Sequence, residues 1–157
     1  MNSNPRPIGW LVLLCRFAIA ALFLLAAIMK LRDIPSFALA IQAFRIIPDH
    51  AGHVTRFAAY FIPWFEVVAG LALLFGVWTR AAALALSLLL GAFLVMIVTV
   101  VLRGIDTTCS CFGKLDLVCK GGVGWCHVGR NAVLMAMGLL VAIAGPGPLT
   151  IDRREVK

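Results

Sequence analysis

Residues 81–102 read AAALALSLLLGAFLVMIVTVVL, a run that contains no charged side chain. A helix needs about 20 apolar residues to cross the hydrocarbon core of a bilayer. The run satisfies that length, and Arg103-Gly104 closes it with a positive charge and a helix-breaking residue. This stretch therefore predicts a membrane-spanning helix.

The composition of the whole chain supports a membrane protein. The chain has 157 residues, 62% of them hydrophobic, and a mean hydropathy of +1.02. Soluble domains are only about half apolar. The formal net charge is +7, but the basic residues flank the apolar runs instead of gathering on one polar surface. This arrangement is typical of membrane flanks and argues against a nucleic-acid partner.

Three further runs are long enough to span a bilayer: Trp10–Met29, Phe57–Trp78 and Val128–Ala144, the last of which can start near Trp125. The first is too long for the roughly 7–15 apolar residues of a secretory signal, so we expect it to be retained. The turn before residue 81 is very short, which makes the second and third spans antiparallel neighbours. We predict an all-α, integral membrane four-helix bundle over residues 1–157 as one domain, with a cysteine-bearing loop between helices 3 and 4.

The connection between the first two spans contains a shorter apolar piece, residues 37–47. Phe37, Ile41 and Phe44 recur in it at helical spacing. We therefore expect a short helix at the membrane interface.

Four spans place both termini at one side, the terminal face, and both long connections at the other, the loop face. Five basic residues belong to the terminal face and eight to the loop face. The former are Arg6, Arg80, Arg153, Arg154 and Lys157; the latter are Lys30, Arg32, Arg45, Arg56, Arg103, Lys114, Lys120 and Arg130. The positive-inside rule thus weakly favours a cytoplasmic loop face. Disulfide chemistry favours a periplasmic one, and we adopt that side.

Two charged residues fall inside the spans. Arg16 lies in the first and Glu66 in the second, at similar depths. An unpaired charge at the bilayer centre costs roughly 2.5–3.5 kcal/mol or more, so each needs a partner. Arg16 with Glu66 is the simplest pair, and Lys30 or Arg130 are alternatives for Glu66. The pair is interpreted either as a structural ion pair or as a site for proton transfer and quinone binding.

The loop before the last span carries Cys109, Cys111, Cys119 and Cys126 in the spacing C-x-C-x7-C-x6-C. A structural zinc site usually shows C-x2–4-C in both halves, which this spacing does not. Two static disulfides and redox-active thiols are the other interpretations. A C-x-C disulfide closes a small, strained ring that is easily reduced, which favours redox activity. Cys15, inside the first span, is interpreted as a small buried hydrophobe.

Several motifs together resemble the DoxX-like superfamily and, within it, the MauE family of methylamine utilisation proteins. They are Arg16-Phe17, Ile28-Met29-Lys30-Leu31, Ile62-Pro63-Trp64-Phe65-Glu66 with Gly70, Gly76-x-x-Thr79-Arg80, Cys109-x-Cys111-Phe112-Gly113 and Arg130-Asn131. They cover most of the chain, and their combination is more specific than any one of them.

The resemblance implies a four-span protein of the bacterial inner membrane. It implies a role in maturing a disulfide-rich periplasmic protein, the small subunit of methylamine dehydrogenase, beside a thioredoxin-like partner, MauD. By position, Cys109 and Cys111 become the active pair, and Arg16, Lys30, Glu66 and Arg130 the polar residues of the bundle. Cys119 and Cys126 lie outside the shared motif. They make the chain look functionally closer to quinone-coupled disulfide generators, without a sequence match to them.

We therefore expect an inner-membrane thiol–disulfide oxidoreductase or electron carrier. Cys109 and Cys111 would exchange with a periplasmic thioredoxin-like protein, Cys119 and Cys126 would resolve, and a membrane quinone would bind near Arg16 and Glu66. The direction of electron flow stays open, as does whether the chain is an enzyme. A non-enzymatic assembly factor with a stapled loop and a thiol-cluster metal-handling protein are the alternatives, although we expect no metal. Solute transport is weaker, because no span is visibly broken.

Overall fold

The computed structural model describes residues 7–44, 52–104 and 124–145. They form five helices, α1 (Pro7–Arg32), α2 (Ile34–Ala43), α3 (Gly52–Phe75), α4 (Thr79–Leu102) and α5 (Trp125–Ala144), and no strand occurs among them. Within these ranges four helices, all except α2, are long and apolar enough to cross a membrane. The predicted all-α membrane bundle is confirmed, while the residues between Gly104 and Gly124 lie outside the described ranges.

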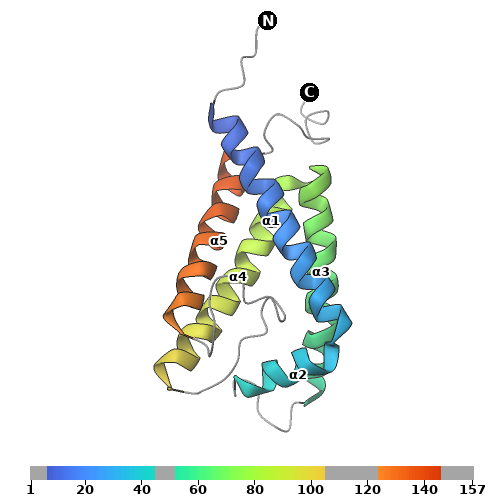
Figure 1. Ribbon diagram of the computed structural model, residues 1–157. Helices are drawn as coiled ribbons and strands as arrows, with labels where there is room; N and C mark the ends of the chain where they lie inside the picture. The colour runs from blue at the N-terminus through green and yellow to red at the C-terminus, as the bar shows by residue number, and fades with distance from the viewer. Residues whose placement is uncertain (1–6, 45–51, 105–123, 146–157) are drawn as a thin grey trace, which may run out of the picture.

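The four long helices alternate in direction, and each packs against two others (Figure 1). Contacts join α1 to α3, α3 to α4, α4 to α5 and α5 to α1, which closes the bundle. The start of α1 and the end of α5 lie at the same end, the top in Figure 1. The described helices therefore have a terminal face at the top and a loop face at the bottom.

The short helix α2 lies across the loop face, below the end of α1 and against α3 (Figure 1). Asp33 caps it, because its carboxylate accepts a hydrogen bond from the backbone N–H of Ser36 at 3.2 Å. Such a cap satisfies one of the free N–H groups of a helix start. The short helix predicted from Phe37, Ile41 and Phe44 is confirmed, and all three side chains are buried.

The turn between α3 and α4 explains why the second span ends earlier than its apolar run. Gly76 has a φ of +71°, a left-handed conformation that favours glycine. The N–H of Gly76 donates to Leu73 O, and the N–H of Val77 donates to Ala72 O at 2.9 Å. These two bonds form a Schellman motif, which stops α3 at Phe75.

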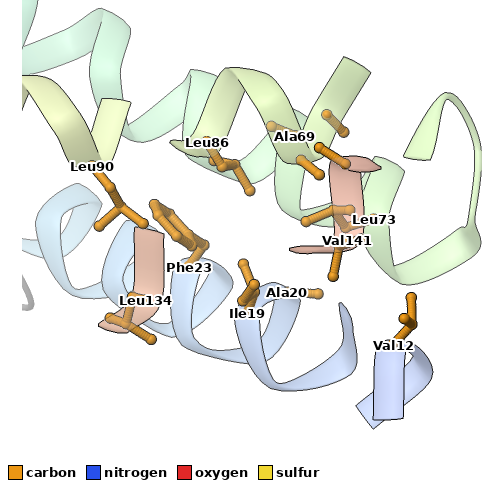
Figure 2. Close-up of a cluster of buried hydrophobic side chains, with 13 residues drawn as sticks. Val12, Ile19, Ala20, Phe23, Ala69, Leu73, Leu86, Leu90, Leu134 and Val141 are labelled. Carbon is orange, nitrogen blue, oxygen red and sulfur yellow. The ribbon is translucent and has the colours of Figure 1, made fainter. Parts of the chain in front are cut away.

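Apolar side chains fill the bundle in two clusters. The larger one joins α1, α3, α4 and α5 through residues such as Phe23, Leu73, Leu90 and Val141 (Figure 2). The smaller one lies towards the loop face, where α2 meets α3 and α4; it contains Phe37, Ile41, Ala59, Phe93 and Ile97. Large apolar side chains also cover the outside, as expected for helices that face lipid.

Candidate functional site

A buried ion pair marks the level at which the two apolar clusters meet. Lys30 Nζ lies 2.5 Å from Glu66 Oε1, and the two side chains are only 2% and 1% exposed. Lys30 comes from the last turn of α1 and Glu66 from the middle of α3. Because both side chains are buried, each charge depends on the other for stabilisation.

Two aromatic rings flank the ammonium group of Lys30. Its Nζ lies 5.2 Å from the centre of the Phe37 ring and 5.3 Å from that of Phe93. A cation over the face of an aromatic ring gains about 0.5–2 kcal/mol, with the larger values at desolvated sites. Phe37 belongs to α2 and Phe93 to α4, so these contacts fix both helices around the lysine.

A small cavity lies beside the pair. Its walls come from α1, α3, α4 and α5 through Phe23, Ala26, Lys30, Glu66, Leu90, Phe93 and Asn131. With Phe37 of α2 on the lysine, side chains of all five described helices converge here.

Asn131 is the polar residue that α5 contributes to this cavity. Its Nδ2 donates to the carbonyl of His127, one turn earlier, at 2.9 Å. Its Oδ1 is buried and accepts no hydrogen bond, and Glu66 Oε2 is likewise buried without a donor. The cavity thus combines a cation, a carboxylate and an amide with two acceptor atoms still unused.

The pair predicted between Arg16 and Glu66 is wrong. Glu66 Oε1 takes its hydrogen bond from Lys30, and Oε2 takes none. Arg16 is buried about four turns earlier in α1, roughly 21 Å along the axis, where its guanidinium carbon lies 5.1 Å from the centre of the Phe17 ring. The prediction failed because α1 continues beyond Met29 and α2 covers its end, which places Lys30 inside the protein instead of at its edge.

Arg130 does not bond to Glu66 either, because neither carboxylate oxygen receives its donors. It is half-buried in the second turn of α5. Of the four polar residues proposed for the bundle, the structure brings together Lys30 and Glu66.

A second, apolar pocket of ≈ 190 Å³ lies next to this site. Its wall consists of Ile41, Ala58, Ile62, Leu89, Ala92, Phe93 and Met96. Phe93 lines both spaces, and the centre of its ring lies 5.3 Å from Nζ of Lys30. Ala92, which lines the pocket, is exposed on the outside of α4.

Cys126 lies in the first turn of α5, exposed and disulfide-bonded. Cys109, Cys111 and Cys119 lie outside the described residues, so their predicted roles stay predictions. Cys15 carries a free thiol and packs, half-buried, against the larger apolar cluster, as predicted. The part of the chain that the structure describes contains no group of three or more metal-ligating side chains, but most of the cysteines lie elsewhere.

The sequence interpretation did not assign Asn131, Phe37 and Phe93 to the site. Asn131 carried a usable signal, because a polar residue in a membrane span usually faces the bundle interior. The two phenylalanines carried none, since their rings are indistinguishable in sequence from ordinary core residues.

Comparison with known proteins shows which family the chain resembles. A family model described as methylamine utilisation protein MauE matches residues 8–144. Methylamine utilization protein MauE of Paracoccus denitrificans is 34% identical over 141 residues, which are 89% of this chain and 73% of that protein. Its counterpart from Paracoccus versutus is 37% identical over 137 residues, 84% of this chain and 70% of that protein. No solved structure matches the chain significantly.

Proposed function

The chain belongs to the MauE family of methylamine utilisation proteins, and from this premise we propose that it is a membrane thiol–disulfide electron carrier. In this proposal its cysteine loop exchanges disulfides with a protein partner, and its helical bundle passes the electrons to or from a lipid-soluble quinone. The four long apolar helices make it a multi-pass membrane protein.

One observation carries the proposal: α5 links a disulfide to the buried polar site. Cys126, in its first turn, is disulfide-bonded, and Asn131 lines the cavity with Lys30 and Glu66. The two positions are about 7.5 Å apart along the helix axis. The disulfide-bonded Cys126 therefore lies within one and a half turns of Asn131, which shares a cavity with a cation and a carboxylate.

The electron balance closes in two exchanges. A reduced partner attacks the loop disulfide through a thiolate, a mixed disulfide forms, and the partner leaves oxidised while the loop becomes a dithiol. Re-forming the loop disulfide then releases two electrons and two protons. A membrane quinone is the proposed acceptor, because as a quinol it carries both. The opposite direction uses the same steps in reverse.

The residues divide between these tasks. Cys109 and Cys111 are proposed to exchange disulfides with the partner. Cys119 and Cys126 are proposed as a resolving pair, which exchanges with the first pair. Glu66 is suited to accept or release a proton and Lys30 to stabilise the charge of that carboxylate, while the apolar pocket beside Phe93 fits a ring or isoprenoid tail. Arg16 and Arg130 are proposed as further polar residues of the bundle, and neither bonds to Glu66.

We place the protein in the bacterial inner membrane with the cysteine loop in the periplasm, where disulfides persist. The proposed partners are a thioredoxin-like protein similar to MauD and the disulfide-rich periplasmic protein that it helps to mature. No nucleic acid takes part.

The disulfide at Cys126 also favours a second candidate function, a non-enzymatic assembly factor whose loop is stapled by static disulfides. That function predicts that cysteine variants lower the amount of protein without lowering its turnover per molecule.

The two functions are separated by a thiol-exchange assay on the purified full-length protein in lipid nanodiscs. The electron donor is a reduced thioredoxin-like protein and the acceptor a short-chain quinone. We expect Cys109→Ser and Cys111→Ser each to abolish quinone reduction, while Cys15→Ser, whose thiol is free and packs half-buried against the larger apolar cluster, retains it. Thiol exchange that persists in both loop variants would contradict the proposal.

The quinone part has its own test at the apolar pocket. Ala92→Phe adds a ring to the pocket wall from its lipid-exposed side, so we expect slower quinone reduction with unchanged disulfide exchange. Leu88→Phe is the matched control, because Leu88 lies on the same helix, is 74% exposed and does not line the pocket. Equal quinone reduction by the two variants rules out this pocket as the quinone site.

A further inference from the structure

We propose that the cavity enclosed by Lys30, Glu66 and Asn131 binds one water molecule, which donates hydrogen bonds to Glu66 Oε2 and Asn131 Oδ1. Asn131 is then a positioning residue that holds a proton donor against the buried carboxylate. The water site stands on the geometry alone, whereas its use in proton transfer rests on the proposed function.

Two unused acceptors point to a shared donor. Glu66 Oε2 and Asn131 Oδ1 are both buried without a hydrogen bond, on side chains that are each 1% exposed. Leaving such a group unpaired costs about 1–3 kcal/mol, and more for a charged one. Both residues line the same cavity, although they come from α3 and α5. One small molecule with two donor hydrogens can therefore serve both oxygens.

The orientation of the Asn131 amide follows from its other hydrogen bond. Its Nδ2 donates to the carbonyl oxygen of His127 at 2.9 Å. A flipped amide would bring two acceptor oxygens together at this position, so the flip is disfavoured. Oδ1 is consequently the atom left for the cavity.

The size of the cavity matches one water. The volume open to the centre of a water molecule is ≈ 10 Å³. A buried water needs about 10–15 Å³ by this measure, and it usually has two to four polar partners. Besides Glu66 and Asn131, Lys30 lines the same space. A larger polar ligand does not fit.

The charge of Lys30 selects water over a metal cation. A carboxylate and an amide oxygen could also ligate a sodium ion. Here the positive Nζ already lies 2.5 Å from Oε1 of the same carboxylate, and a second cation at Oε2 would be repelled at short range in a medium of low dielectric constant. A neutral donor avoids this repulsion and still satisfies both acceptors.

The water gives Glu66 Oε2 a proton donor, whereas Lys30 donates to Oε1. In the proposed function each turnover moves two protons with two electrons. A proton that is released when the loop disulfide re-forms can bind to the water while the water passes one of its own protons to Glu66 Oε2. The water stays neutral, and Glu66 is left to pass its proton to the reduced quinone.

The direct test is a structure of the full-length protein in lipid nanodiscs at a resolution that shows ordered water. We expect one density peak within about 2.5–3.2 Å of both Glu66 Oε2 and Asn131 Oδ1. An empty cavity overturns the proposal, as does a direct hydrogen bond between the two side chains. The result does not depend on thiol exchange, so it fails or succeeds independently of the proposed function.

A spectroscopic test addresses the positioning role. Asn131→Leu keeps a similar volume but removes the amide acceptor, and we expect it to shift the infrared carboxyl bands assigned to Glu66 by comparison with Glu66→Gln. Ser87→Ala is the matched control, because Ser87 is also a buried polar residue but donates to Ala83 O of its own helix, away from the cavity. Glu66 bands that are the same in Asn131→Leu and wild type contradict the role.

Discussion

Lys30 is the residue on which the candidate site depends. It is held by Glu66 of α3 and lies over the rings of Phe37 and Phe93. The sequence predicted that a charge inside a span needs a partner, but not which partner. A shift of three residues in the end of α1 decides whether Lys30 lies at the membrane edge or in the core. An apolar run locates a helix end only to within a few residues. Here α2, and not the run itself, buries the lysine.

Removing one partner of the ion pair should destabilise the protein more than removing both. Lys30→Met leaves Glu66 buried without a counter-charge, which we expect to cost about 3–5 kcal/mol. Lys30→Met combined with Glu66→Gln removes both charges and should recover most of that loss. The measurement is thermal unfolding of the wild type and both variants, all purified in one detergent. A double variant that is no more stable than the single one would show that the two residues are not a coupled pair.

The helices approach most closely where small residues meet, and α4 and α5 show it best. A Cβ added at Gly138 would lie 2.4 Å from Ser87 Oγ and 3.6 Å from Ser87 Cβ. Small residues allow such close packing between membrane helices. The sequence predicted the four long helices from the length of their apolar runs. It did not use Gly76, where the chain leaves α3 before its apolar run ends, or Asp33, which caps α2. It did not predict which faces meet, because a lipid-facing surface is as apolar as a packed one.

Gly138→Ala should therefore destabilise the bundle through this one contact. We expect a loss of about 1–3 kcal/mol, as is usual for overpacking a core. Ser87→Ala in the same chain removes the hydroxyl and leaves an ordinary distance, so the double variant should regain most of the stability. Unfolding of the two single variants and the double variant measures the coupling. Strictly additive effects would contradict a direct clash.

At the scale of the whole molecule, four long helices alternate in direction and leave the start of α1 and the end of α5 at one face (Figure 1). This much followed from the apolar runs. The closed order α1, α3, α4, α5 and the convergence of all five helices on one polar site did not follow. A bundle with two faces separates tasks: disulfide exchange is proposed at the loop face, and proton and electron transfer inside.

The account depends most directly on where the loop cysteines lie and how easily they are reduced. The measurement is labelling of intact cells with a bulky, membrane-impermeant maleimide, before and after mild reduction, in a Cys15→Ser background. Band shifts on a gel then report the loop cysteines. We predict that Cys109 and Cys111 react only after mild reduction, which requires an easily reduced disulfide outside the cytoplasm. If they react only once the membrane is permeabilised, the loop is cytoplasmic, and the proposed periplasmic disulfide exchange is contradicted.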